Sequence, residues 1–182
     1  EPGTFYLFDR AARKLTPLLA EAHWLDPTRM ATKQPFEFAA RDGLKLQGYV
    51  SFPPGVEKAR HLPMVVFVHG GPYGVRDDWD YDPYVQALAT HGYLVLQVNY
   101  RGSGGYGYAF VKAGWRGWGG KMQDDVTDAT KWAIAQGIAD PARICIFGGR
   151  YGGYAALEGA VKEPDLYKCA IGYVGVYYLA LM

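Results

Sequence analysis

The sequence has little net charge, few cysteines and no long apolar run. Nineteen Lys and Arg residues balance 18 Asp and Glu residues, which leaves a formal net charge of +1 and predicts no attraction to nucleic acid or membranes. No apolar run approaches the ~20 residues of a membrane span, and no signal-peptide pattern opens the chain, which favours a cytoplasmic protein. Cys145 and Cys169 both lie in apolar runs. We expect them to be small core residues, not a disulfide or metal ligands.

Glycine and tyrosine, by contrast, are abundant. The chain has 182 residues, 24 of them Gly and 15 Tyr, and 49% of its residues are hydrophobic. This length suffices for one domain with a full core. The composition suits strands, tight turns and aromatic packing, and it excludes a disordered chain or a coiled coil.

Antiparallel strands are predicted in the first 52 residues. A β-type run at 5–8 can pair with 14–19 as a hairpin, which is too small to form a domain alone. Residues 20–34 have little periodicity and are predicted to be a linker. The runs 35–40 and 44–52 alternate between apolar and polar residues around an Asp-Gly turn signal, so a second hairpin is expected there.

From residue 64 onward, strands and helices are predicted to alternate. Continuous apolar runs indicate strands covered on both faces, while helical periodicity and capping signals indicate helices between them. The strands are expected at 64–68, 94–100, 143–147 and 169–176. The helices are expected at 83–91, 121–136 and 151–161, with a flexible loop at 101–107. This order predicts an α/β fold with a mostly parallel sheet and helices on both faces.

The stretch 144–156, ICIFGGRYGGYAA, has the pattern of a nucleophile elbow. An apolar strand leads into a glycine-rich turn and then a helix of small residues, as in the motif Gly-x-Ser-x-Gly. Gly148 and Gly152 occupy the glycine positions, but Arg150 stands where the nucleophile is expected. A guanidinium is always protonated and has only donors, so it cannot attack a carbonyl. The alternative is a glycine-rich turn of another doubly wound fold, although the dinucleotide-binding spacing does not fit, and no cofactor is expected.

A second glycine-rich segment, His69-Gly70-Gly71-Pro72, follows the predicted strand at 64–68. Glycines at the carboxyl end of a buried strand leave backbone N–H groups accessible. An oxyanion hole needs such a donor beside the N–H that follows the nucleophile. A plain turn at the end of a strand is the alternative interpretation.

Four motifs occur in order along the chain: VHGGPY at 68–73, NYRGSGGYG at 99–107, Trp118-Gly119-Gly120 before Asp124-Asp125-Val126, and GGRYGGY at 148–154. Together they resemble the catalytic domain of the prolyl oligopeptidase family of serine peptidases, with greater similarity to its acylaminoacyl-peptidase and dipeptidyl-peptidase branch. The resemblance covers nearly the whole chain. It implies an α/β-hydrolase fold and cleavage of peptide or acyl-amino bonds through a Ser acyl-enzyme.

The resemblance places Arg150 on the family's nucleophilic Ser. It implies that the backbone N–H groups of Gly71 and Tyr151 form the oxyanion hole, and that His69 falls where some members carry an oxyanion-binding Tyr. The pocket residues that it implies are His69, Gly70 and Tyr73. No metal is implied.

No residue of this chain matches the family's catalytic Asp and His, which lie far beyond the nucleophile. The other histidines, His23, His61 and His91, are expected to be structural or solvated. Tyr151 and Ser103 are the only hydroxyls expected near the site, and we predict no base beside either. Because losing the Ser and His of a triad costs about a million-fold in turnover, measurable peptidase activity is not expected.

Residues 1–19 are similar to the last strands of the β-propeller that precedes the hydrolase domain in this family. We therefore divide the chain into residues 1–34, a remnant of propeller strands with a linker, and residues 35–182, a truncated α/β-hydrolase domain.

Two questions about Arg150 follow from its position. The nucleophile of an elbow is held at φ > 0, at a cost of ~1–3 kcal/mol for a non-Gly residue, so either the strain persists or the turn relaxes. An Arg at a helix N-terminus could also bind an anion. We favour instead a pairing with the acidic cluster Asp77, Asp78, Asp80 and Asp82.

The predicted strand at 169–176 forms an edge of the sheet and is apolar and nearly chargeless. Because such an edge is a template for strand pairing, a homo-oligomer is expected. Three functions remain open: an inactive piece of a peptidase, a self-assembling scaffold, and an anion-binding or other hydrolytic site around Arg150 that a partner subunit completes.

Overall fold

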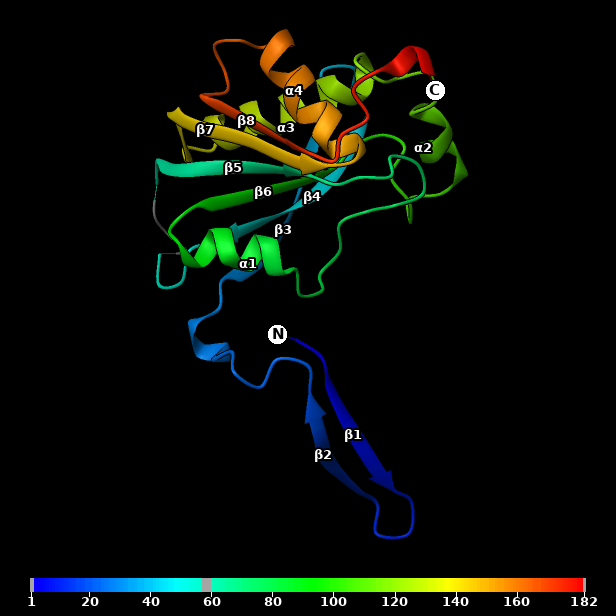
Figure 1. Ribbon diagram of the computed structural model, residues 1–182, viewed down its shortest axis with the longest axis vertical. Coiled ribbons are helices and arrows are strands. Elements are labelled where there is room, and N and C mark those ends of the chain that lie inside the picture. Colours follow the sequence, from blue (N-terminus) through cyan, green and yellow to red (C-terminus); the bar gives the residue numbers. More distant parts are fainter. Residues whose placement is uncertain (1, 57–59, 182) are drawn as a thin grey trace.

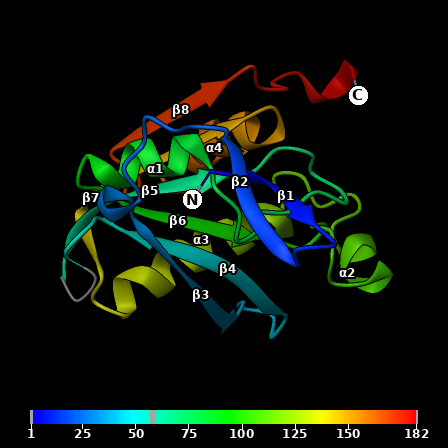
Figure 2. The same ribbon diagram turned by 90° about the horizontal axis from the view of Figure 1, so that it is seen from below.

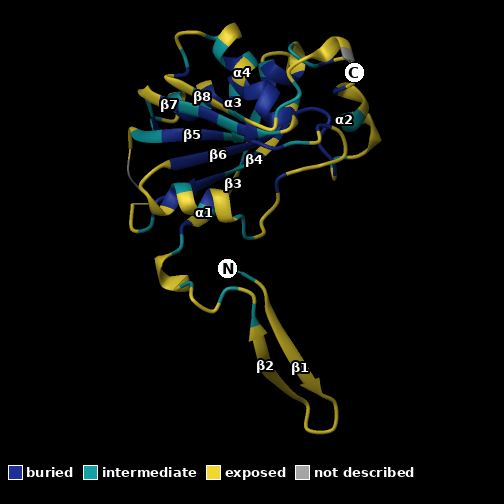
Figure 3. Cartoon of the chain, viewed as in Figure 1, coloured by how far each residue is buried: buried dark blue, intermediate teal, exposed yellow. Residues whose placement is uncertain are grey.

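A β-hairpin forms the N-terminal part of the chain. The computed structural model describes residues 2–56 and 60–181. In it, β1 (Thr4–Asp9) pairs antiparallel with β2 (Lys14–Ala20), which confirms the first predicted hairpin. Figure 1 shows this hairpin projecting away from the other strands, and Figure 3 shows that it is almost entirely exposed. A linker with one short 3₁₀ turn, η1 (Pro27–Arg29), connects it to the main sheet.

The main sheet has six strands in the order β3-β4-β6-β5-β7-β8. Their bounds are β3 (Thr32–Ala39), β4 (Lys45–Phe52), β5 (Leu62–Val68), β6 (Leu94–Asn99), β7 (Ala139–Gly149) and β8 (Cys169–Tyr173). The pairs β3–β4 and β4–β6 are antiparallel, and the other neighbours are parallel. Figure 2 shows β3 and β8 at opposite edges. The α/β fold with a mostly parallel sheet is therefore confirmed, although β8 ends three residues earlier than predicted.

Of the four α-helices in the described part of the chain, three lie where the sequence predicted them. These are α1 (Pro83–Thr90), α3 (Lys121–Ala135) and α4 (Tyr151–Lys162). The Asp82 carboxylate caps α1 by accepting the backbone N–H groups of Tyr84 and Val85, at 2.8 and 3.0 Å. The short α2 (Tyr108–Ala113) was not predicted, because it buries no residue and has no side-chain cap at its start. A second 3₁₀ turn, η2 (Leu179–Leu181), lies near the C-terminal end of the described chain.

The helices cover opposite faces of the sheet. Side chains of α3 and α4 pack with alternate residues of β5, β6 and β7 in the larger core, and α1 packs with Val95 in a smaller core on the other face. Ile144 and Ile146 belong to the larger core, so Cys145 between them faces the other way. Among the described residues, no helix is long and apolar enough to cross a membrane.

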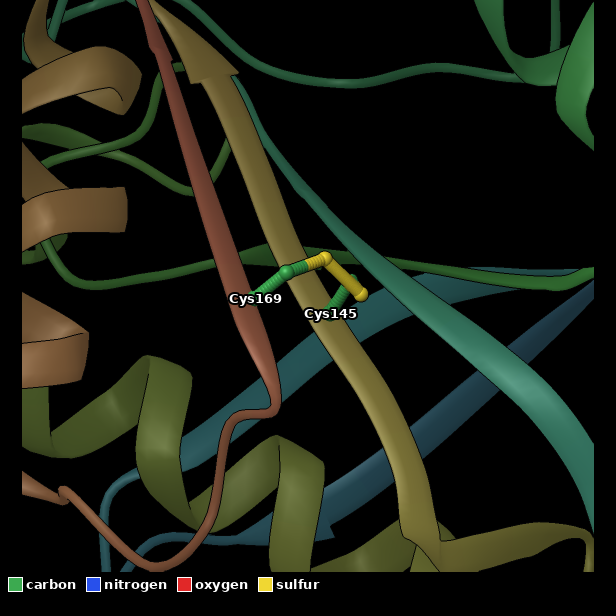
Figure 4. The surroundings of a disulfide bond; sticks show 2 residues. All are labelled: Cys145 and Cys169. Atoms are coloured by element: carbon green, nitrogen blue, oxygen red, sulfur yellow. A yellow bond between two sulfur atoms is a disulfide. The ribbon is translucent and has the colours of Figure 1, made fainter.

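The expectation for the two cysteines was wrong, because Cys145 and Cys169 form a disulfide (Figure 4). They are partners in the parallel register of β7 and β8, and their Cα atoms lie 4.6 Å apart. Neither is a core residue: Cys145 is half-buried and Cys169 is exposed. Near the edge of the sheet, only one face of β7 and β8 packs against the larger core. The two cysteines lie on the opposite face of these strands.

Candidate active site

The predicted elbow is present, and its strain persists. β7 ends at Gly149, α4 begins at Tyr151, and Arg150 between them has φ 56° and ψ −120°. A non-Gly residue in this region costs ~1–3 kcal/mol, so the surroundings must hold it there. The Arg150 N–H donates to the Tyr173 carbonyl at 2.9 Å, and the Arg150 carbonyl accepts the N–H groups of Gly153 and Tyr154 at 3.0 and 3.2 Å. The turn is therefore fixed by β8 on one side and by its own helix on the other.

Two glycines allow the elbow to pack directly on β5. A Cβ on Gly152 would clash with the carbonyl oxygen of Val68 and lie 3.1 Å from that of His69. A Cβ on Gly148 would lie 2.7 Å from the same Val68 oxygen. Real Cβ atoms do not approach backbone atoms so closely, so the pattern of glycines reflects packing between the elbow and the end of β5.

Arg150 does not pair with the acidic cluster, which corrects our expectation. Arg150 is exposed, and its side chain lies against Gly70. A Cβ added to Gly70 would be 3.3 Å from the Arg150 Cβ. Among the ion pairs of the described residues, none involves Arg150. The Arg150 guanidinium therefore has no carboxylate partner within the described chain.

The acidic cluster instead covers the α1 face of the sheet. Lys33 Nζ donates to the backbone carbonyls of Asp78 and Asp80, at 2.9 and 3.0 Å. Asp77 is buried and its carboxylate accepts Gln97 Nε2 at 2.7 Å. Burial raises the pKa of Asp77 to about 7, despite that hydrogen bond and the nearby charge of Lys33. Asp77 is therefore paired with Gln97, and no ion pair of the described residues joins the acidic cluster to Arg150.

The second predicted donor of the oxyanion hole, Gly71, lies in the loop that follows β5. Within the described chain, its N–H makes no hydrogen bond. The Tyr151 N–H is the first of α4, and such groups have no acceptor inside their own helix. Within the described residues, both N–H groups that the sequence predicted are thus without backbone partners, and the segments that carry them contact each other at Gly70 and Arg150.

The 101–107 segment holds the Gly71 loop in place. The Gly74 N–H donates to the Gly102 carbonyl at 3.0 Å, and the Gly104 N–H donates to the Val75 carbonyl at 2.9 Å. Tyr73, half-exposed, donates its hydroxyl to the Gly114 carbonyl at 3.2 Å. The segment expected to be a flexible loop is therefore a packed support for the candidate oxyanion hole.

His69 lies behind this loop, in a buried hydrogen-bond network. Its ring stacks on Tyr100 with centroids 4.3 Å apart. Nδ1 lies 2.8 Å from the Gly70 carbonyl oxygen, and Nε2 lies 2.9 Å from Ser103 Oγ. Burial lowers the pKa of His69 to about 4, so the ring is neutral at pH 7. Both ring nitrogens are engaged, which makes His69 a structural residue of the loop.

Our prediction that Ser103 has no base beside it was wrong, since His69 Nε2 is in contact with its hydroxyl. Ser103 is nevertheless fully buried, and its Oγ lies 2.6 Å from the Tyr100 carbonyl oxygen. A substrate cannot reach it. The Ser103–His69 pair is therefore a buried hydrogen-bonded contact inside the fold.

Tyr151 likewise offers no nucleophile. Its ring is buried among Tyr100, Trp118 and Tyr154, with centroids 4.7 to 5.8 Å apart. Its hydroxyl has no hydrogen-bond partner among the described residues. Burial raises the pKa of this phenol well above its usual value, so it stays protonated.

A buried ion pair that the sequence did not assign anchors the supporting segment. Arg101 follows β6, and its Nε and Nη2 donate to the two carboxylate oxygens of Asp125 on α3, at 2.8 and 2.7 Å. The Arg101 backbone N–H donates to the same carboxylate at 2.8 Å. Nη1 and Nη2 also reach Asp42 in the β3–β4 turn, at 2.8 and 3.0 Å. The available signal was an acidic residue on the apolar side of the predicted 121–136 helix.

Comparisons with known proteins support the resemblance to the prolyl oligopeptidase family. Residues 79–182 match the prolyl oligopeptidase family. The chain is 40% identical over 180 residues to dipeptidyl aminopeptidase BIII of Pseudoxanthomonas mexicana and 34% identical over 195 residues to dipeptidyl peptidase family member 6 of Caenorhabditis elegans. Each match covers 96% of this chain but only 26% of the relative, so the chain spans about a quarter of their length.

Solved structures of other peptidases have a similar fold, and two of them serve as examples. A puromycin-hydrolyzing peptidase of Mycobacterium tuberculosis superposes with a TM-score of 0.86 at 31% identity, over 99% of this chain and 28% of that one. The acylaminoacyl peptidase of Pyrococcus horikoshii gives a TM-score of 0.73 at 31% identity, over 82% of this chain and 24% of that one. The elbow, the glycine loop after β5 and these similarities lead to one conclusion: the chain belongs to the prolyl oligopeptidase family.

Proposed function

We propose that this chain is part of a serine-hydrolase domain and that it is catalytically silent, because Arg150 occupies the position of the nucleophile and no residue of the chain matches the family's catalytic Asp and His. Relatives named for dipeptidyl peptidase and acylamino-acid-releasing activity indicate peptide or acyl-amino bonds as the substrate class of the parent family. One observation carries the proposal: the strained turn of an elbow, at φ 56°, presents a guanidinium instead of a hydroxyl.

The chemistry of the surrounding groups supports the proposal. A guanidinium has no lone pair to give a carbonyl, and it remains protonated at any pH of interest. The nearest candidate replacements, Ser103 and Tyr151, are buried. The N–H groups of Gly71 and Tyr151, which have no acceptor among the described residues, would still stabilise an oxyanion, but no bond to the substrate forms without a nucleophile.

The proposal is tested by ester hydrolysis and covalent labelling of the 182-residue chain. We expect the wild type and R150A to hydrolyse p-nitrophenyl acetate at the same rate as buffer, and neither to react with a fluorophosphonate probe. R150A is the matched control, because it removes the cation without adding a hydroxyl. Hydrolysis by the wild type that the probe abolishes would contradict the proposal.

R150S separates two causes of the missing activity. We expect no recovery of labelling in this variant, because His69 is already engaged in hydrogen bonds and the sequence offers no match to the family's Asp and His. Recovery would instead mean that Arg150 alone silences the site.

If phosphate raised the melting temperature of the wild type but not of R150A, the alternative of an anion site around Arg150 would be favoured.

Self-association through β8 is a second candidate function. Within the described residues, β8 pairs only with β7, and Ile171 and Tyr173 are 54% and 62% exposed. An apolar sheet edge of this kind favours pairing with a second copy. Light scattering over a range of concentrations should detect a dimer or larger species, and a monomer at the highest concentration would contradict the idea.

A further inference from the structure

The disulfide between β7 and β8 has two sulfurs in different surroundings. Cys145 is half-buried on the inner strand, where its register partner on β5 is the buried Val65. Within the described residues, Cys169 is exposed and β8 is an edge strand of the sheet. Figure 4 shows the disulfide bond bridging the two strands. A molecule approaching from solvent therefore meets Cys169 first.

We propose that Cys169 is a site of thiol–disulfide exchange that accepts a small thiol such as glutathione. The thiolate attacks Cys169 Sγ, a new S–S bond forms between them, and the Cys145–Cys169 bond breaks. Cys145 leaves as a thiolate and takes a proton from water. A second thiol then attacks the mixed disulfide, giving a free Cys169 thiol and one molecule of the oxidised small thiol. Two thiols are thus oxidised and one protein disulfide is reduced, so the electrons balance.

Access decides which cysteine becomes modified. Exchange requires the attacking sulfur, the attacked sulfur and the leaving sulfur to lie in line, and its rate depends on how easily that line is reached. Attack on Cys145 would need the small thiol to approach from the side of β5, where Val65 and the α1 core are packed. Attack on Cys169 needs only an approach to an exposed edge strand. The mixed disulfide should therefore form on Cys169, with Cys145 as the leaving thiol.

The strand pairing can persist through the exchange. β8 is held to β7 by backbone hydrogen bonds over residues 169–173, and Lys168 N–H donates to the Ile144 carbonyl at 2.7 Å. β8 also packs against α4, where a Cβ on Gly153 would lie 3.1 Å from the Tyr173 oxygen. Modification is therefore expected on the folded protein, and not only after unfolding.

The test uses the wild-type chain purified without reductant. It is incubated with reduced glutathione below the concentration that reduces all of it, quenched with acid, alkylated and digested for mass spectrometry. We expect a disulfide-linked pair of peptides before treatment, and afterwards glutathione on Cys169 with the alkyl group on Cys145. Glutathione on Cys145, equal amounts on both, or no linked peptides in the starting protein would overturn the proposal.

Single-cysteine variants give an independent measurement. C145S leaves only Cys169 and C169S leaves only Cys145, and their reaction with a coloured aromatic disulfide reports access to each thiol. We expect Cys169 in C145S to react roughly tenfold faster than Cys145 in C169S, since reactivity follows exposure. Equal rates in two variants with native circular dichroism, or a faster Cys145, would contradict the assignment. If either variant fails to fold, the mapping on the wild type still decides.

Discussion

Replacing Gly152 with Ala is expected to destabilise the domain by about 3 kcal/mol or more, or to prevent folding. The new Cβ would clash with the Val68 carbonyl oxygen and lie 3.1 Å from that of His69. Both are backbone atoms at the end of β5, so neither can move away by changing a rotamer. Gly152 lies in α4, where Ala would by helix propensity alone stabilise by about 0.5–1 kcal/mol. The two effects have opposite signs, and urea unfolding shows which one dominates.

Gly149→Ala is the matched control for this experiment. Gly149 lies on the same elbow, but a Cβ there would meet only atoms of Tyr173, at 3.7 Å, an ordinary contact distance. Its φ is not in the left-handed region, so Ala can adopt its backbone conformation. We expect a change within about 0.5 kcal/mol. If Gly152→Ala unfolded at the same urea concentration as the wild type, close packing of the elbow on β5 would be refuted.

Local patterns were sufficient to predict most of the fold. The apolar runs that became β5, β6 and β7, and the capping signals of α1, depend on residues close together in the sequence, so they can be read without coordinates. The elbow was predicted for the same reason, because the strand, glycines and helix that define it are contiguous. Whether the strain at Arg150 persists could not be decided from the sequence, and the structure shows that it does, with φ 56°.

Interactions between distant segments were not predictable in this way. The disulfide depends on the register of β7 against β8, which brings together two cysteines 24 residues apart. The His69–Ser103 contact joins the ends of two neighbouring strands, and the sequence does not show which side chains meet there. The expected pairing of Arg150 with the acidic cluster was wrong for the same reason. Asp77 accepts a hydrogen bond from Gln97, an amide on β6, and the sequence does not show that these two side chains meet.

Replacing Asp125 with Asn is the second change for which we expect a large effect, a loss of roughly 3–5 kcal/mol in the free energy of unfolding. The Asp125 side chain is fully buried and that of Arg101 is 5% exposed. The Arg101 guanidinium stays charged when Asp125 is neutralised, because an arginine side chain is always protonated in proteins. Asp42, whose side chain is 35% exposed, remains as its only carboxylate in the described chain. The buried cation is then left partly unpaired.

Asp128→Asn provides the control for Asp125→Asn on the same helix. Asp128 also accepts several hydrogen bonds from an arginine, Arg41, with the shortest at 2.7 Å, but the Arg41 side chain is 47% exposed. Solvent screens such a pair, and we expect a loss of about 1 kcal/mol or less. Both substitutions remove one negative charge from α3, so their difference isolates the effect of burial. Equal losses in denaturant unfolding would show that the Arg101–Asp125 pair does not anchor the segment supporting the Gly71 loop.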